Sequence, residues 1–270
     1  MIDNAYLRGD VLFGDDLSPS DIEKWHADEE RGYYELVHSV FFKDSDYVYE
    51  YAALNEHYGY RPIRGRHYRR ALALGCARGD DVAPIADNVD EFLAVEPAEK
   101  WWSRSIGGKS ARYVKPTMTG EIPCGAGEID LTICLGVLHH IPNATRVINE
   151  ISRVSATNAH FILREPISTM GDWTKPRVGL TKNERGLPVK WLDKTLSDAG
   201  FVFERRAFCM FPLTGRLANL LGGGNAYSNP KFVAIDKVMS AAMSWNYYYH
   251  RDRWFKKIAP SCAFYILRKI

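Results

Sequence analysis

The chain has 270 residues, of which 46% are hydrophobic and 25% are charged. This composition is that of a globular protein, so it excludes a chain that is disordered, collagen-like or a coiled coil throughout. The net charge of +2 conceals an uneven distribution: residues 1–60 hold 14 acidic and 4 basic side chains, and residues 201–270 hold 3 acidic and 11 basic ones. A basic C-terminal part indicates an anionic substrate or a membrane surface, but it fits two oppositely charged faces equally well.

The five cysteines are spread along the chain without a C-x-x-C pair, which indicates neither a disulfide framework nor a zinc site. No window of 18 mostly apolar residues is present, and the first residues lack the basic and apolar pattern of a secretory signal. We therefore expect a cytoplasmic protein without a transmembrane segment and without a bound metal.

Residues 1–60 are expected to form an N-terminal helical cap. The run Ser18-Pro19-Ser20-Asp21 is typical of a helix start, because a hydroxyl or carboxylate can accept hydrogen bonds from free backbone N–H groups and Pro is tolerated there. Eight aromatic residues between Trp25 and Tyr51 fit helices packed on a larger body.

Residues 61–207 are expected to form an α/β core. After a basic segment (61–70), short apolar runs at 71–75, 92–95, 129–135 and 161–163 predict buried strands. Apolar residues at helical spacing between 147 and 154 predict a helix between the last two, and a further helix near 191–199 ends before Gly200. Strands alternating with helices predict crossover connections and a parallel sheet.

A strand at 201–203 and a last strand within 261–270 complete the predicted sheet, and residues 208–260 between them form an insertion. A connection of this length needs structure of its own. Its second half mixes aromatic and basic side chains from Trp245 to Lys257, which suits binding of sugars, bases, anions or a membrane interface. The alternative is a lid helix with a packed aromatic face and a solvated basic face.

The segment 74–79 (Leu-Gly-Cys-Ala-Arg-Gly) is a glycine-containing turn after the first core strand, where the backbone can approach a ligand closely. The dinucleotide fingerprint fails, because Ala77 and Asp80 stand where it requires glycine, and a dehydrogenase is therefore disfavoured. Glu96 follows the second strand, where a carboxylate can accept hydrogen bonds from both hydroxyls of a ribose, although an ordinary exposed acid is the alternative. The pattern favours a nucleoside cofactor without a diphosphate.

Three segments resemble the class I S-adenosylmethionine-dependent methyltransferases: residues 74–79, residues 95–97 (Val-Glu-Pro) and, most specifically, the run 129–142 that ends in Leu-His-His-Ile-Pro. The resemblance covers about residues 71–206 and the last strand. It implies a Rossmann-like, seven-stranded, mostly parallel sheet with helices on both faces, S-adenosyl-L-methionine as cofactor, and methyl transfer as activity.

The resemblance also implies the cofactor-binding residues. The turn residues would surround the methionine end, Glu96 with Pro97 would hold the ribose, and the residues after the third and fourth parallel strands would lie by the adenine and line the pocket. These positions are Gly75, Cys76, Ala77, Gly79, Glu96, Pro97, Thr117, Met118 and Leu135. The family usually has an acid two residues before the first glycine and a glycine at the middle of the turn, where this chain has Ala73 and Ala77. The missing acid is a usual anchor for the cofactor's ammonium group, so two expectations stay open: weaker cofactor binding, or compensation by Asp80 or a residue of the N-terminal cap.

His139 and His140 follow a strand at the carboxyl edge of the sheet, where ligands bind in open α/β folds. Either imidazole can take a proton from an attacking hydroxyl, and we favour His140, with Glu165 as a further catalytic candidate. The alternatives are histidines that only shape the loop, and a surface ion pair between Arg164 and Glu165.

The sequence thus predicts a methyltransferase that methylates a hydroxyl of a sugar, glycan precursor or other small metabolite, with residues 208–260 forming the substrate lid. The substrate is phosphorylated or lipid-linked if the basic and aromatic groups bind it, which allows peripheral contact with a membrane. Two alternatives remain open: an RNA methyltransferase, which residues 61–70 favour and the absence of a known RNA-binding motif opposes, and a catalytically inactive S-adenosylmethionine-binding protein.

Overall fold

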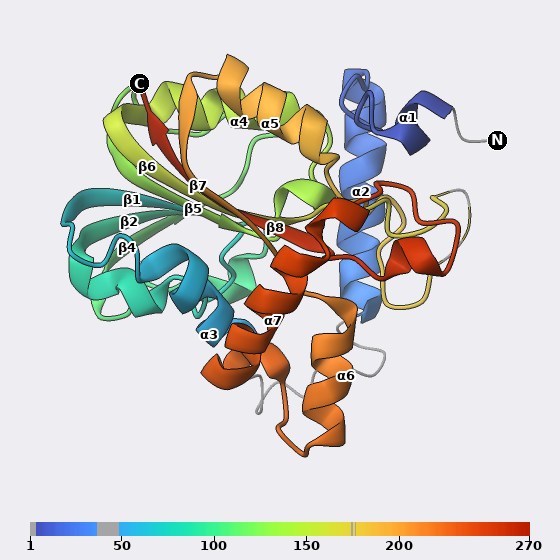
Figure 1. The fold of residues 1–270 in the computed structure, drawn as a ribbon. Coiled ribbons are helices and arrows are strands. Elements are labelled where there is room, and N and C mark those ends of the chain that lie inside the picture. The colour runs from blue at the N-terminus through green and yellow to red at the C-terminus, as the bar shows by residue number, and fades with distance from the viewer. Residues whose placement is uncertain (1–3, 37–48, 174, 176) are drawn as a thin grey trace.

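A computed structural model describes residues 4–36, 49–173, 175 and 177–270 (Figure 1). Among these residues, eight strands form one mixed sheet in the order β3-β4-β2-β1-β5-β6-β8-β7. The strands are β1 (Tyr68–Leu74), β2 (Val89–Val95), β3 (Ser105–Ile106), β4 (Lys109–Val114), β5 (Ile129–Leu135), β6 (Ser155–Pro166), β7 (Phe201–Cys209) and β8 (Cys262–Lys269).

The five central strands β4, β2, β1, β5 and β6 are parallel, and β8 runs antiparallel to both β6 and β7. The mostly parallel Rossmann-like sheet expected from the sequence is therefore confirmed. The chain order reverses between β1 and β5, so the carboxyl ends of these two strands form the switch point where open α/β sheets bind ligands.

The sheet has one strand more than the seven expected. The additional strand is β3, a two-residue segment that pairs antiparallel with β4 across a tight turn. Gly107 and Gly108 of this turn have φ of 55° and 81°, a conformation that glycine adopts without steric strain. A two-residue strand is too short to carry an alternating pattern, which is why the sequence did not reveal it.

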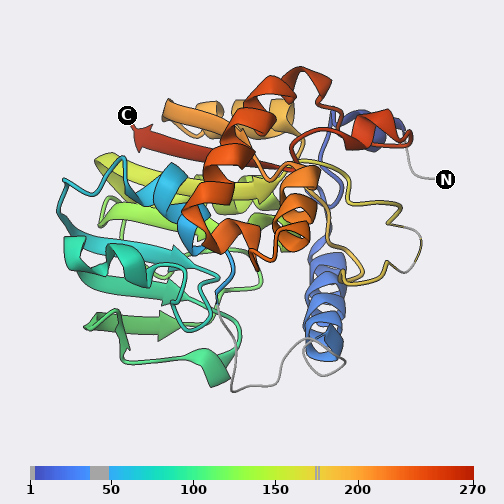
Figure 2. The same ribbon diagram turned by 60° about the horizontal axis from the view of Figure 1, so that its bottom comes forward.

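Helices cover both faces of the sheet (Figures 1 and 2). α4 and α5 lie on one face, and α3, η2, α6 and α7 lie on the other, each face having its own cluster of buried apolar side chains. The helices are α1 (Asn4–Arg8), α2 (Pro19–Leu36), α3 (Ala52–Asn55), η2 (Glu56–Tyr60), η3 (Ala83–Asn88), η4 (Glu99–Trp101), η5 (Leu138–His140), α4 (Ala144–Val154), α5 (Val189–Asp198), α6 (Pro212–Leu220), η6 (Ala226–Ser228), α7 (Pro230–Ala242), η7 (Ser244–Asn246) and η8 (Phe255–Lys257).

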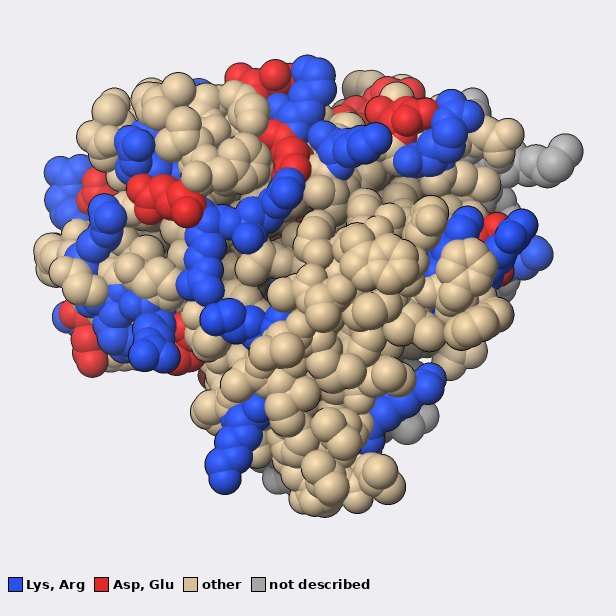
Figure 3. Space-filling model, viewed as in Figure 1, with Lys and Arg blue, Asp and Glu red and all other residues tan. Residues whose placement is uncertain are grey.

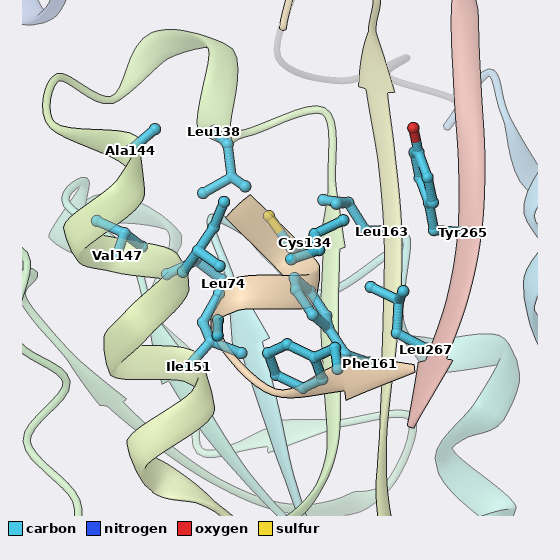
Figure 4. Packing of buried hydrophobic residues seen from close by; sticks show 14 of the residues in the cluster. Leu74, Cys134, Leu138, Ala144, Val147, Ile151, Phe161, Leu163, Tyr265 and Leu267 are labelled. Atoms are coloured by element: carbon cyan, nitrogen blue, oxygen red, sulfur yellow. The ribbon is translucent and has the colours of Figure 1, made fainter. Parts of the chain in front are cut away.

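The packing of α4 shows how sequence spacing produces a layer. Val147, Ile148, Ile151 and Val154 recur at helical spacing, and all are buried against the sheet, where Figure 4 shows Val147 and Ile151 beside Leu74 and Phe161. The helix begins after Asn143, and Asp15 accepts hydrogen bonds from the Thr145 backbone N–H and hydroxyl, at 2.8 and 2.5 Å. The N-terminal segment is thereby attached to the core.

α2 stands beside the carboxyl ends of the strands (Figure 1). It begins at Pro19, and the Ser18 hydroxyl accepts a hydrogen bond from the Asp21 N–H at 3.3 Å, which agrees with the predicted helix start. The Trp25 indole donates to the His140 carbonyl at 2.7 Å. Several of the aromatic residues expected to pack in this part lie within residues 37–48, outside the described residues.

The segment between β7 and β8 carries α6, η6, α7, η7 and η8. Its base is held by the buried Asp236 of α7, whose carboxylate accepts hydrogen bonds from the Met210 and Phe211 N–H groups and the Thr214 hydroxyl. Figure 3 shows that the surface over α6 and α7 has few charged side chains. Exposed apolar residues there include Leu220, Leu221, Val238 and Trp245. Within the described part of the chain, every helix is too short or too polar to cross a membrane.

Candidate functional site

The turn after β1 brings the backbone of three segments together. Gly75 has φ of +62°, and a Cβ there would lie 2.6 Å from the Val137 side chain that follows β5. Gly79 has φ of +86°, and a Cβ there would lie 2.7 Å from Ile106. Both positions therefore require glycine for conformation and for space. The chain then continues into the six-residue 3₁₀ helix η3.

Glu96 supports this turn from the end of β2. Its side chain is buried, and its two carboxylate oxygens accept hydrogen bonds from the N–H groups of Ala77 and Ala98, both at 2.9 Å. Burial raises the pKa of Glu96, and the two N–H groups oppose that rise. Ala77 has φ of +46°, which strains a residue with a Cβ, and the Tyr113 hydroxyl donates to its carbonyl at 3.0 Å. Glu96 thus holds the strained residue in place, a contact that the sequence did not reveal.

The other predicted cofactor residues differ in exposure. Cys76 and Leu135 are buried beside the turn and at the end of β5, whereas Pro97 is exposed. Thr117 lies in a turn after β4, where its hydroxyl accepts a hydrogen bond from the Glu121 N–H at 2.7 Å, and the Met118 side chain is exposed.

His139 lies in a buried ion network. Its Nδ1 is 2.8 Å from a carboxylate oxygen of Glu165, and its Nε2 is 3.5 Å from one of Glu184. Burial alone would lower the pKa of His139, but the two carboxylates outweigh burial and raise that pKa to about 9. The other Glu165 oxygen accepts hydrogen bonds from the N–H groups of Val137 and Leu138, at 2.9 and 2.8 Å. His139 is thus a charged structural group at neutral pH.

His140, the next residue, has a different environment. Its side chain is 37% exposed, against 9% for His139, and its Nδ1 lies 3.1 Å from a carboxylate oxygen of Glu29 on α2. Glu29 is itself held by the Thr181 hydroxyl at 2.5 Å and the Asn183 N–H at 3.0 Å. A carboxylate on Nδ1 favours the tautomer in which Nε2 carries the lone pair. This arrangement suits a general base.

Arg185 fixes the loop that carries both histidines. It is fully buried and donates to the carbonyls of Leu138, His139 and Ile141, and to that of Phe13 in the N-terminal segment. The sequence analysis missed Glu29, Glu184 and Arg185, because each acts across more than 40 residues of chain and none lies in a recognisable motif.

Arg164 and Glu165 do not form the surface ion pair that was one alternative. Both side chains are buried, and as successive residues of β6 they point to opposite faces of the sheet. Glu165 joins the His139 network, and Arg164 points toward α3, where it donates to Asn55 Oδ1 at 3.1 Å.

His139, His140 and Glu184 each offer a potential metal-ligand atom, and these atoms lie within 4.8 Å of one another. In this structure the same side chains are engaged in ion pairs, His139 with Glu165 and Glu184 and His140 with Glu29.

Comparisons with known proteins agree with this geometry. Residues 72–163 match the model of the methyltransferase domain family, a span that contains the glycine turn, Glu96 and both histidines. A search of curated proteins found no significant match.

Solved structures of methyltransferases share the fold. A protein proposed to be a sarcosine dimethylglycine methyltransferase from Galdieria sulphuraria has a TM-score of 0.53 at 15% identity, over 90% of this chain and 98% of that one. The N-methyltransferase NodS from Bradyrhizobium japonicum, solved with S-adenosyl-L-homocysteine, has a TM-score of 0.50 at 12% identity, over 90% and 98%. An S-adenosylmethionine-dependent methyltransferase from Mesorhizobium loti has a TM-score of 0.50 at 12% identity, over 78% and 97%.

The sheet order, the glycine turn and the acid after β2 define a Rossmann-like domain of the kind that binds a nucleoside cofactor. Residues 72–163 also match the methyltransferase domain family, so this part of the chain is similar to a methyltransferase domain with a Rossmann-like fold. The expectation drawn from residues 74–79, 95–97 and 129–142 is confirmed at this level.

Proposed function

We propose that the protein methylates a hydroxyl group of a sugar, glycan precursor or other small metabolite, with S-adenosyl-L-methionine as methyl donor. The observation that carries this proposal is the pair His140 and Glu29 at the carboxyl end of β5, a half-exposed imidazole oriented by a carboxylate. An oxygen nucleophile must lose its proton during methyl transfer, and a positioned base typically accelerates such a step by about 10² to 10⁴.

The residues of the turn fit the cofactor. Gly75 and Gly79 leave the space that a Cβ would fill, and the buried Glu96 carboxylate retains acceptor capacity for ribose hydroxyls beyond its two backbone partners. The bound cofactor would supply an electrophilic methyl group on a sulfonium, so the protein's contribution is to align the acceptor and exclude water.

In this mechanism His140 Nε2 accepts the proton of the acceptor hydroxyl, while Nδ1–H donates to Glu29, whose negative charge stabilises the resulting imidazolium. His139 and Glu165 act as positioning residues, because Glu165 fixes the backbone of residues 137 and 138 and His139 links it to Glu184. Neither is placed to receive the acceptor proton, since both are buried and fully engaged.

The charge distribution supports a small acceptor over RNA. The basic segment 61–70 precedes and enters β1, and so lies toward the amino ends of the strands, opposite the carboxyl edge. Its Arg70 pairs with Glu91 and Glu128, and its Arg64 pairs with Glu56, so these charges are neutralised within the protein. A phosphate backbone would have to displace these acids.

The insertion has fewer basic side chains free to bind an acceptor than its sequence suggests. Arg251 donates to the carbonyls of Ala259 and Pro260, and Lys256 pairs with Asp252. Trp245 and Trp254, 77% and 74% exposed, remain available for stacking on a saccharide or for contact with a lipid-linked acceptor at a membrane surface. We propose that this segment binds the acceptor and not the cofactor.

The test transfers a radiolabelled methyl group from S-adenosylmethionine to a panel of sugars, sugar nucleotides and lipid-linked saccharides. We expect label on a hydroxyl oxygen, and we expect His140→Ala to lower kcat at least about tenfold with S-adenosylhomocysteine affinity nearly unchanged. Glu29→Gln should lower kcat less, and His67→Ala, an exposed histidine on Asp90, is the control. A wild-type rate in His140→Ala, or label on nitrogen or RNA, would contradict the proposal.

A further inference from the structure

Two side chains of opposite charge are buried beside the glycine turn, and neither forms an ion pair with another described residue. Asp81, two residues after Gly79, is 8% exposed, and Arg164, at the end of β6, is 6% exposed. The catalytic arrangement described above uses neither. Because an unpaired buried charge is costly, a pair of them close to a binding turn needs an explanation.

Asp81 is held through its backbone and by nearby backbone N–H groups, but one of its carboxylate oxygens is unsatisfied. Its carbonyl accepts a hydrogen bond from the buried Tyr60 hydroxyl at 2.5 Å, whereas its Oδ1 has no hydrogen-bond partner among the described residues. Burial raises the pKa of Asp81 to about 7, against the opposing charge of Arg164. The charged and titratable groups around it are Tyr49, Tyr60, Cys76, Asp80, Tyr113, Cys134 and Arg164.

Arg164 uses only part of its donor capacity. It donates to Asn55 Oδ1 at 3.1 Å and weakly to the Leu135 carbonyl at 3.4 Å, and its guanidinium lies 4.2 Å from the centre of the Tyr51 ring. Within the described ranges it forms no ion pair with a carboxylate. A Cβ on Gly136 would lie 3.5 Å from its Nη2, so the turn after β5 leaves room against the guanidinium.

The contacts of Gly75 and Gly136 place Arg164 near the turn, and Asp81 follows Gly79 of the turn by two residues. Gly75 packs against Val137, and Gly136, one residue earlier, packs against Arg164. Asp81 and Arg164 influence each other electrostatically but are not in ion-pair contact. A group that carries one charge of each sign at a short separation would therefore satisfy both.

We propose that Asp81 and Arg164 bind the amino-acid end of the cofactor, Asp81 its α-ammonium group and Arg164 its α-carboxylate. This inference rests on the proposed use of S-adenosylmethionine. It supplies the anchor that is absent at Ala73, a fully buried residue with no charge to offer. Glu96, at the other side of the turn, is left for the nucleoside end.

The experiment measures calorimetric affinity for two probes, S-adenosylhomocysteine and methylthioadenosine, which has the same nucleoside but no amino-acid group. In Asp81→Asn and Arg164→Gln, the affinity for S-adenosylhomocysteine should fall at least tenfold, while that for methylthioadenosine should change less than twofold. Asp80→Asn, at the exposed neighbouring acid, and Arg69→Gln, at an exposed arginine, are matched controls and should bind as the wild type does.

An equal loss for both probes, or no loss for S-adenosylhomocysteine, would overturn this inference while leaving the cofactor assignment intact. A wild-type protein that binds neither probe would overturn the assignment itself. If the variants do not fold, proton release measured with the wild-type protein still tests the proposal. Between pH 6 and 7 a protonated Asp81 must release its proton to accept an ammonium group, so calorimetry in two buffers should detect proton release with S-adenosylhomocysteine and none with methylthioadenosine. Equal proton release with both would contradict the proposal.

Discussion

Arg164 and Glu165 are neighbours on β6, yet they enter two very different charge clusters on opposite faces of the sheet. On one face, Glu165, His139 and Glu184 neutralise one another, and every oxygen of Glu165 has a partner. On the other face, within the described residues, Arg164 interacts with Asn55, Leu135 and the Tyr49 hydroxyl but with no carboxylate in an ion pair, and Asp81 Oδ1 has no hydrogen-bond partner.

The His139 cluster is a closed network, in which every charge has a partner within the protein, whereas Asp81 and Arg164 form an incomplete one. In a closed network, removing one member leaves the others as unpaired buried charges, so the loss appears in stability. In an incomplete network the missing partner is a ligand, so the loss appears in binding, and stability can even improve when a charge is removed.

His139→Ala should have the largest effect, a loss of folding stability. The change leaves the fully buried Glu165 without its cationic partner, which should lower the free energy of unfolding by about 3 to 5 kcal/mol. His140→Ala, at a partly exposed ion pair, should cost no more than about 1 kcal/mol. Denaturant unfolding of both variants measures this, and equal losses would show that the His139 cluster is not a closed network.

In the ligand-free protein, the buried Asp81 should make stability depend on pH. Burial raises its pKa from 3.8 to about 7, so the protonated form is favoured in the folded state. Its stabilising contribution is present below pH 4 and is lost as the pH rises through 7.

Asp81→Asn should therefore be more stable than the wild type by about 2 to 4 kcal/mol at pH 8, and the difference should shrink steadily toward pH 4. Denaturant unfolding across this range measures it, with Asp80→Asn as the control. A difference that is the same at every pH would mean that Asp81 is already paired.

Glu96 tests the nucleoside side of the turn. Glu96→Ala should weaken binding of S-adenosylhomocysteine by about 1.5 to 3 kcal/mol and of methylthioadenosine by the same amount, because both carry the ribose. This parallel loss contrasts with the selective loss expected for Asp81 and Arg164. Glu96→Gln keeps an acceptor for a backbone N–H, so its affinity should lie between those of the wild type and Glu96→Ala. Unchanged affinity in Glu96→Ala would refute the ribose role.

The smallest effect is expected from Ala77→Gly. Relief of the left-handed conformation at φ of +46° should raise stability by up to about 1 kcal/mol, or about 2 to 4 °C in Tm. Ala73→Gly, inside β1, should lower stability instead. If thermal unfolding showed both variants to be less stable, the strain at Ala77 would not be real.

Much of the fold was predictable because its signals are local. Apolar runs indicated the parallel strands β1, β2, β5 and β6, and the spacing of Val147, Ile148, Ile151 and Val154 indicated α4, whereas the parallel strand β4 has no apolar run. The glycine turn and the histidine pair were found for the same reason, since each is a contiguous motif. The two-residue β3 carried no such signal.

The partners within the site could not be predicted, because they are set by tertiary contacts. Glu29 meets His140 across 111 residues, and nothing near it in the sequence marks it among the acids of its segment. Asp81 follows Asp80, and only the structure shows that one is buried and the other exposed. The missing acid at Ala73 was a usable signal, since it directed attention to other acids near the turn.

The alternation of Arg164 and Glu165 also constrains how β6 assembles. Arg164 lies opposite Phe264 of β8 and Glu165 lies opposite Ala263. A slip of β6 by one residue would exchange the faces of all its side chains. Arg164 would then move toward the positive charges of His139 and Arg185, and Glu165 would move away from the backbone N–H groups that hold it. Such a misaligned sheet would bury two uncompensated charges. The central strands are therefore kept in one register by electrostatic exclusion of the wrong one, in addition to their apolar pattern.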